Sequence, residues 1–240
     1  MKYSILTLFP DLIKSYIKTS IIKKAIERNL IEVEIVDIRD FSTLKNKQID
    51  DYQFGGGKGM LIMIEPIVRA INSIKTPKSN IILTSPQGKT FNQKLAIEFS
   101  SHEHIIIICG HYEGFDSRIS AYINQEVSIG DYVLTGGELA AMVIIDSTSR
   151  CVDSVIQKES LENDSFYDGL LDHDAYTKPV EFDGQKVPDV LLSGNHQNIN
   201  KYKLESKLKN TYKKRPDLLE KIKFDSEKLL ILEKIKKEEV

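Results

Sequence analysis

A run of four isoleucines, Ile105 to Ile108, limits what this chain can fold into more than any other feature. The run continues into Cys109, so both faces of the strand it predicts are apolar. Such a strand is typical of the centre of a parallel sheet that helices cover on both sides. The segment 110–118 that follows is polar and contains two glycines. Because ligands of open α/β sheets bind at the carboxyl ends of the strands, we expect a site directly after Cys109.

A second segment, 128–138, predicts a turn of the same kind. Strand-like residues precede the pair Gly136 and Gly137, and Glu138 then begins an apolar helix. Glycines in such a turn allow the backbone to approach a ligand that a Cβ atom would exclude. The same pair is also compatible with a tight turn that only requires positive φ.

A third segment, 50–60, contains four glycines and Lys58, and ten of the thirteen glycines fall between positions 55 and 137. Lys58 does not belong to a phosphate-binding P-loop, because that motif requires Ser or Thr where Gly59 stands and Gly where Tyr52 stands. A dinucleotide fingerprint is also absent from the first predicted strand-to-helix turn, which reads Phe-Pro-Asp at 9–11. The site predicted here is therefore of neither type.

Apolar periodicity along the first 150 residues predicts alternating strands and helices, which is typical of an α/β fold. Residues 39–60 have no clear period, and a loop of this length is usually functional or disordered. From Asn195 onward the pattern is helical. The expected strands are 2–9, 31–38, 80–83, 103–108 and 127–134, and the expected helices are 11–29, 65–74, 92–99, 116–122 and 138–150.

Composition sets further limits. The net charge is −2, so no global basic character indicates a nucleic-acid partner, but residues 193–240 contain thirteen Lys and Arg against eight Asp and Glu. A polyanion would therefore bind the C-terminal part, unless these charges are only a solvated helical face. Two cysteines do not indicate a disulfide framework, and neither a membrane span nor a signal peptide is predicted. We expect a cytoplasmic enzyme.

The three segments, in this order and spacing, together with Leu191-Leu192-Ser193-Gly194-Asn195-His196, resemble the bacterial tRNA (guanine-N(1))-methyltransferases, a branch of the SPOUT methyltransferases. The resemblance covers nearly the whole chain. It implies a parallel-sheet domain with a C-terminal trefoil knot, followed by a small and mostly α-helical domain. The implied boundaries are 1–152 for the knotted domain that binds S-adenosylmethionine, 153–168 for a linker and 169–240 for the helical tRNA-binding domain.

The resemblance also implies the activity and the partners. The expected reaction transfers the methyl group of S-adenosyl-L-methionine to N(1) of the guanosine at tRNA position 37, in the anticodon stem-loop, by a homodimer whose sites are shared between subunits. A magnesium dependence without a dedicated protein site is implied as well. The alternatives are a SPOUT methyltransferase for another RNA site and a non-catalytic RNA-binding module.

Guanine N(1) carries a proton, so its methylation requires a base, and the resemblance assigns this role to Asp164. It assigns to Arg150 the binding of the guanine edge through its planar donor fork. From their positions alone, Asp164 could be only a helix N-cap and Arg150 only a C-terminal cap. The implied donor-binding residues are Ser85, Pro86, Gly88, Gly110, Tyr112, Glu113, Gly114, Ile129, Gly130, Asp131, Tyr132, Val133, Leu134, Gly136 and Gly137.

The chain departs from the family pattern at three places. Asp153-Ser154 stands where Pro-Gly is typical, Lys178 stands where Arg is typical, and Tyr202-Lys203 stands where Trp-Arg is common. Lys178 retains the attraction for phosphate but loses the bidentate donor fork of arginine. We therefore expect changes in linker geometry and in one RNA contact.

Overall fold

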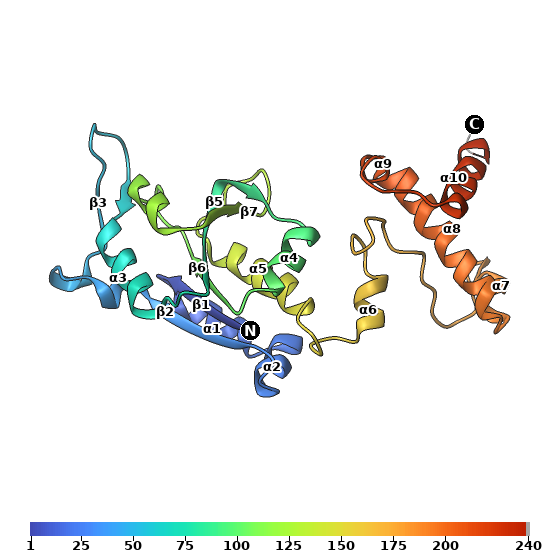
Figure 1. The fold of residues 1–240 in the computed structure, drawn as a ribbon, viewed down its shortest axis with the longest axis horizontal. Coiled ribbons are helices and arrows are strands. Elements are labelled where there is room, and N and C mark those ends of the chain that lie inside the picture. Colours follow the sequence, from blue (N-terminus) through green and yellow to red (C-terminus); the bar gives the residue numbers. More distant parts are fainter. Residues whose placement is uncertain (239–240) are drawn as a thin grey trace. The chain divides into compact units, whose positions relative to one another are not determined.

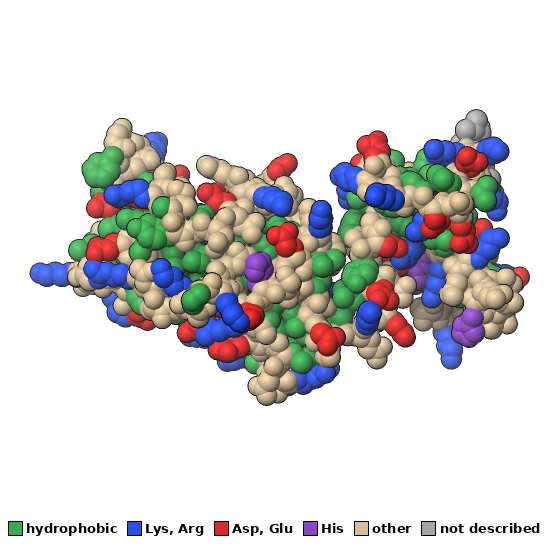
Figure 2. Space-filling model, viewed as in Figure 1, with side chains coloured by type: hydrophobic (Ala, Val, Ile, Leu, Met, Phe, Trp, Pro, Cys, Tyr) green, Lys and Arg blue, Asp and Glu red, His purple; other side chains and the backbone are tan. Residues whose placement is uncertain are grey.

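The computed structural model describes residues 1–238 and divides the chain into two compact units, Met1–Lys158 and Glu159–Val240 (Figure 1). The division falls inside the predicted linker 153–168, whose role as a linker stays a prediction. Lys and Arg side chains are interspersed with Asp and Glu on the face displayed in Figure 2, in keeping with the small net charge.

The first unit is built on a parallel sheet of five strands, which confirms the predicted α/β class. The sheet order is β2-β1-β6-β5-β7, so the four-isoleucine strand β6 lies at the centre, and Ile105 to Ile108 are fully buried. The register pairs Ile5 of β1 with Ile107 of β6, and Ile82 of β5 with the same residue. The strand bounds are β1 Lys2–Thr7, β2 Glu32–Asp37, β5 Ser79–Thr90, β6 His104–Ile108 and β7 Gln125–Ser128.

Successive residues of β6 point into two different hydrophobic clusters. Ile105 and Ile107 pack into one cluster with residues of α2, α4 and α5, whereas Ile106 and Ile108 pack into the other with residues of α3. Both faces of the sheet are therefore covered, which is why the four successive residues Ile105 to Ile108 are all apolar. The helix bounds are α1 Pro10–Ile17, α2 Ser20–Glu27, α3 Ile64–Ile74, α4 Gln93–Ser100 and α5 Glu138–Arg150.

Several predicted elements were wrong in detail. The expected helix 11–29 is broken at Ser20, which has a φ of +51°. The expected strand 127–134 ends at Ser128, where the chain turns. The Ser128 hydroxyl closes this turn: it accepts a hydrogen bond from Gly130 N at 3.2 Å and donates one to Gly130 O at 3.1 Å. The expected helix 116–122 is a short 3-10 helix, Ser117–Tyr122. The loop 39–60 contains an unpredicted hairpin strand, β3 Asp50–Tyr52, paired with β4 Met60–Ile62.

The second unit is mostly helical, and its core contains Leu170, Leu208, Ile231 and Ile235. The predicted helical region begins at Asn195, whose side chain accepts a hydrogen bond from Asn198 N at 3.2 Å and so caps α8. The bounds are α6 Lys158–Asn163, β8 Glu181–Phe182, β9 Gln185–Lys186, α7 Asp189–Leu192, α8 His196–Lys214, α9 Pro216–Leu219 and α10 Ser226–Glu238. No helix of residues 1–238 has the length and apolar character needed to cross a membrane.

Candidate active site

A cavity of about 650 Å³ lies at the carboxyl ends of β5, β6 and β7. Its walls come from three segments: 83–87, where the pairing of β5 with β7 becomes irregular; 110–115, which follows β6; and 126–137, which runs from β7 toward α5. Further residues belong to the 3-10 helix that begins at Ser117. Parallel strands end at the same edge of a sheet, so three segments that are distant in sequence meet there. The volume is within the usual range for a site that binds a small molecule.

Most of the predicted donor-binding residues line this cavity, and Gly88 and Asp131 do not. Gly88 instead packs against β7, because a Cβ atom there would lie 2.3 Å from the backbone nitrogen of Val127. The predicted residues that line the cavity are Ser85, Pro86, Gly110, Tyr112, Glu113, Gly114, Ile129, Gly130, Tyr132, Val133, Leu134, Gly136 and Gly137.

Other cavity residues were not predicted from the sequence. Thr84 begins a turn of small and polar residues directly after the predicted strand 80–83, which is a signal for this edge of the sheet. Glu126 follows a strand pattern, and its only signal is its position near a strand end. Ser117 and Ser120 belong to the segment predicted as a helix, and small polar residues there have no distinctive pattern. His111 also lines the cavity, and its ring lies 4.7 Å from that of Phe9.

The pair Gly136 and Gly137 is required for packing between loops. Gly137 N donates a 2.7 Å hydrogen bond to Gly110 O, and a Cβ atom on Gly137 would lie 2.1 Å from Thr84 Oγ1. A Cβ atom on Gly136 would lie 2.5 Å from Glu138 Oε2 and 2.6 Å from the His111 ring. Neither glycine has positive φ, so a tight turn does not explain why these positions are glycine. The close approach of neighbouring protein atoms does explain it, because a Cβ atom would collide with them.

Glu138, a candidate acid or base by its chemistry, is 3% exposed. Its carboxylate accepts a 2.7 Å hydrogen bond from Thr7 Oγ1, and Thr7 Oγ1 accepts one from Phe9 N at 2.9 Å. Burial, and then the charge of Glu138, raises the pKa of the neighbouring Cys109 thiol. Glu138 is therefore enclosed behind the cavity wall, where it joins the end of β1 to the start of α5.

The hairpin β3–β4 is attached to the loop 112–116, which forms part of the cavity wall. Ile62 N donates to Gly114 O at 2.9 Å, and Glu113 N donates to Met60 O at 3.2 Å. Tyr112, at the turn of this loop, has a φ of +57°, which is uncommon for an aromatic residue. Backbone strain of this kind clusters at functional sites, where the surrounding structure maintains it.

The two predicted catalytic residues belong to different units. Arg150 is the last residue of α5 in the first unit. Asp164 lies in the second unit and directly follows α6, with its N–H bonded to Leu161 O at 3.2 Å. The interpretation of Asp164 as a helix N-cap was wrong, because the helix precedes it. The implied linker 153–168 contains the helix α6.

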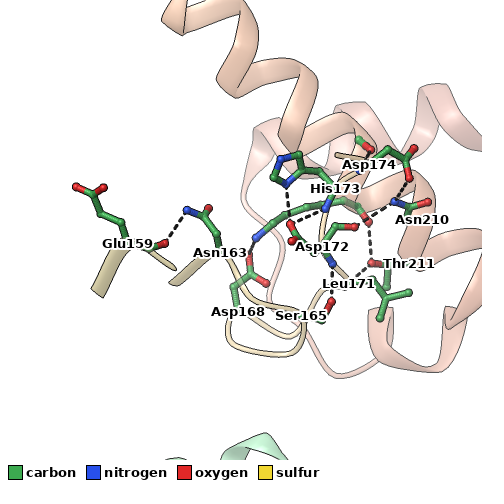
Figure 3. A network of polar contacts seen from close by, with 12 residues as sticks. Glu159, Asn163, Ser165, Asp168, Leu171, Asp172, His173, Asp174, Asn210 and Thr211 are labelled. Atoms are coloured by element: carbon green, nitrogen blue, oxygen red, sulfur yellow. Dashed lines mark hydrogen bonds and ion pairs between the residues drawn. The ribbon is translucent and has the colours of Figure 1, made fainter. Parts of the chain in front are cut away.

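The chain after Asp164 belongs to a network of polar contacts with α8 (Figure 3). Ser165 Oγ accepts a hydrogen bond from Asp172 N at 2.9 Å, and Lys207 Nζ lies 3.3 Å from Asp168 Oδ2. The Lys207 side chain is only 9% exposed. In this arrangement the Lys207 ammonium group is largely buried and is already paired with a carboxylate.

Among the described residues, no three or more His, Cys, Asp or Glu side chains gather in a way that could hold a metal ion.

Comparison with known proteins identifies the family. A family model described as tRNA (Guanine-1)-methyltransferase TrmD matches residues 1–221. A protein of Mycoplasma capricolum subsp. capricolum named tRNA (guanine-N(1)-)-methyltransferase is 57% identical over 240 residues, covering 100% of both chains. A protein of the same name from Dictyoglomus turgidum is 48% identical over 239 residues, covering 99% of this chain and 98% of the relative. The chain therefore belongs to the tRNA (guanine-N(1))-methyltransferase family.

Proposed function

We propose that this protein transfers the methyl group of S-adenosylmethionine to N(1) of the guanosine at position 37 of tRNA. Membership of the family supports guanine N(1) of tRNA as the acceptor. The observation that carries the proposal is the cavity of about 650 Å³ at the carboxyl ends of three parallel strands, lined by the loops that the family resemblance assigns to the donor.

The chemistry of the cavity wall fits this donor. Apolar side chains such as Ile129 and Leu134 suit the adenosyl part, and polar groups such as Ser85 suit the amino-acid part. Glu113 also lines the cavity, and its carboxylate would favour a cationic sulfonium over a neutral molecule. The bound donor would supply an activated methyl group, and the protein has to hold it and deprotonate the acceptor.

Asp164 is the proposed base for the N(1) proton, and Arg150 is the proposed donor to the guanine edge. An ordinary aspartate is a weak base, with an unperturbed pKa of about 3.9. Exclusion of water when tRNA binds would raise its basicity, and the guanidinium of Arg150 would stabilise negative charge that develops on the guanine oxygen. The two residues should therefore act in the same step.

The proposal includes a cytoplasmic homodimer with a knotted donor-binding domain, as in the family resemblance. In a site shared between subunits, Arg150 of one subunit would act together with Asp164 of the other. Mixed dimers test this arrangement. An Arg150→Ala subunit paired with an Asp164→Asn subunit should retain about one working site in two only if the residues act across the interface.

The decisive experiment supplies labelled donor and a tRNA transcript to the purified protein and maps the modified nucleotide. Methylation at guanosine 37, lost when that position is changed to adenosine, is the expected result. Methylation elsewhere would indicate a methyltransferase for another RNA site. Binding of both ligands without product would indicate a non-catalytic RNA-binding module.

A further inference from the structure

Two hydroxyl groups of α8 accept hydrogen bonds from backbone N–H groups of the segment 165–174. Thr211 Oγ1 accepts a hydrogen bond from Leu171 N at 2.9 Å, and Ser206 Oγ accepts one from Asp174 N at 2.9 Å. Thr211 Oγ1 also donates to Lys207 O at 2.7 Å, which orients its lone pair toward Leu171. Thr211 and Ser206 are themselves buried, so water cannot easily replace these contacts.

Two further side chains of α8 reach the same segment. Lys207 Nζ pairs with Asp168 Oδ2 at 3.3 Å, and Asn210 Nδ2 donates to Asp172 O at 3.1 Å and to Asp174 Oδ1 at 2.9 Å (Figure 3). Positions 206 and 210, and positions 207 and 211, are four apart, so they form neighbouring rows on the helix. The helix therefore presents one continuous face of donors and acceptors to this segment.

The segment is also closed on itself next to Asp164. Asp172 N donates to Ser165 Oγ at 2.9 Å, and Phe166 N donates to Leu170 O at 2.7 Å. Leu170 is 1% exposed and packs in the core of the second unit. The residue that follows Asp164 is thus linked through Asp172 to α8, with no long flexible stretch between them.

We propose that Thr211, Ser206 and Lys207 are positioning residues for methyl transfer, which hold the segment after Asp164 on α8. This inference rests on the proposed role of Asp164 as the base. Basic residues such as Lys213 and Lys214 lie on the same helix, so RNA bound there and the base would move as one body. Displacement of a catalytic group by about 1 Å can cost roughly 100-fold in rate, so small losses in this network should be visible in the transfer step.

The test compares two changes of Thr211 in the full-length protein. Thr211→Val keeps the shape but removes the acceptor for Leu171 N, whereas Thr211→Ser keeps the hydroxyl. We expect Thr211→Val to slow single-turnover methylation of the tRNA transcript roughly 10- to 100-fold, without changing the dissociation constants of donor and tRNA measured separately. Thr211→Ser should restore most of the rate. Ser206→Ala, which removes the acceptor for Asp174 N, replaces Thr211→Val if that variant does not fold.

A double variant that combines Thr211→Val with Asp164→Asn distinguishes a positioning role of Thr211 from a general loss of structure. In the Asp164→Asn protein, Thr211→Val should cause little further loss, because the group that it positions can no longer accept the proton. An equal loss in both backgrounds would overturn the inference. A slow Asp164→Asn protein beside a Thr211→Val protein of normal rate would also overturn it while leaving the proposed base intact. A normal rate for Asp164→Asn would overturn the proposed base and the inference together.

Discussion

Thr7 and Glu138 are 131 positions apart in sequence, yet Thr7 Oγ1 donates a 2.7 Å hydrogen bond to the Glu138 carboxylate in the interior of the protein. The bond joins the end of β1 to the first residue of α5. Gly136 and Gly137, directly before Glu138, line the cavity. Through this contact the central part of the sheet supports the turn that forms one wall of the proposed donor site.

Thr7→Val should destabilise the protein, because it leaves a buried carboxylate oxygen without a donor. The expected loss in free energy of unfolding is about 1–3 kcal/mol. Thr7→Ser, which keeps the hydroxyl, is the matched control. Urea denaturation of the three proteins measures the effect, and equal midpoints for Thr7→Val and the unchanged protein would contradict the structural role of this bond.

Gly136→Val should impair both folding and donor binding. The added side chain would collide with Glu138 and the His111 ring, and the buried Glu138 cannot move into solvent. Ser120→Trp provides the contrast, because Ser120 is an exposed cavity residue where a large side chain would occupy the cavity without such a collision. Calorimetry should show loss of donor binding at a normal melting temperature for Ser120→Trp, and full affinity there would place the donor elsewhere.

His104 should make the protein less stable as the solution becomes mildly acidic. Burial, and then the positive charge of Lys2, lowers the pKa of His104 below its usual value of about 6.5. Its Nε2 lies 2.9 Å from Ser4 Oγ, which donates to Glu34, and its Nδ1 lies 2.7 Å from Ser79 Oγ. This arrangement suits a neutral ring that donates from Nε2 and accepts at Nδ1.

The sign of the pH effect follows from that lowered pKa. Below about pH 6.5 the unfolded chain takes up a proton that the folded protein resists, so stability falls as the pH decreases toward the folded-state pKa and is recovered above pH 6.5. Denaturation midpoints at about pH 7.5 and about pH 5.5 measure the effect. His104→Gln, which does not titrate, should show a smaller difference between the two, and an unchanged difference would assign the effect to other groups.

Asp164→Asn should lower turnover by roughly 10²–10⁴, the usual contribution of a general base. The side chain keeps its size but cannot accept the N(1) proton, and because Asp164 follows α6, no helix cap is lost. Donor affinity and melting temperature should remain nearly unchanged. Single-turnover rates across about pH 6–9 provide the measurement, and near-normal rates over that range would exclude Asp164 as the base.

Binding of tRNA should weaken with salt through the basic end of α8. Lys213 and Lys214 are in the last turn of that helix. Changing either to Gln should reduce the slope of log affinity against log salt by roughly 0.7–0.9, as expected for one lost phosphate contact. Lys24→Gln is the matched control, because it removes the same charge from an exposed lysine of α2. Equal slopes for the unchanged protein and for all three variants would show that the end of α8 is only a solvated surface.

The amino-acid pattern by itself determined the α/β class, the central position of β6 and the edge where the cavity lies. Four consecutive isoleucines indicate a strand that is buried on both faces. The glycines of the cavity follow predicted strands, namely Gly110, Gly114 and the Gly136–Gly137 pair. The fold class and the position of the cavity could therefore be predicted from residues that are neighbours in the chain. Most residues of the cavity wall were named in advance only because the family resemblance implied them.

Only the tertiary structure decided the contacts between distant segments. Three contacts join residues that no local pattern relates: the Thr7–Glu138 bond, the attachment of the β3–β4 hairpin to Gly114, and the pairing of the buried Lys207 with Asp168. From the sequence, a lysine in a basic helix is expected to be exposed to solvent. It contributes to the structure only when packing buries its side chain and places a carboxylate beside its charge. Local propensity and periodicity describe one element at a time, whereas burial and pairing depend on which elements meet.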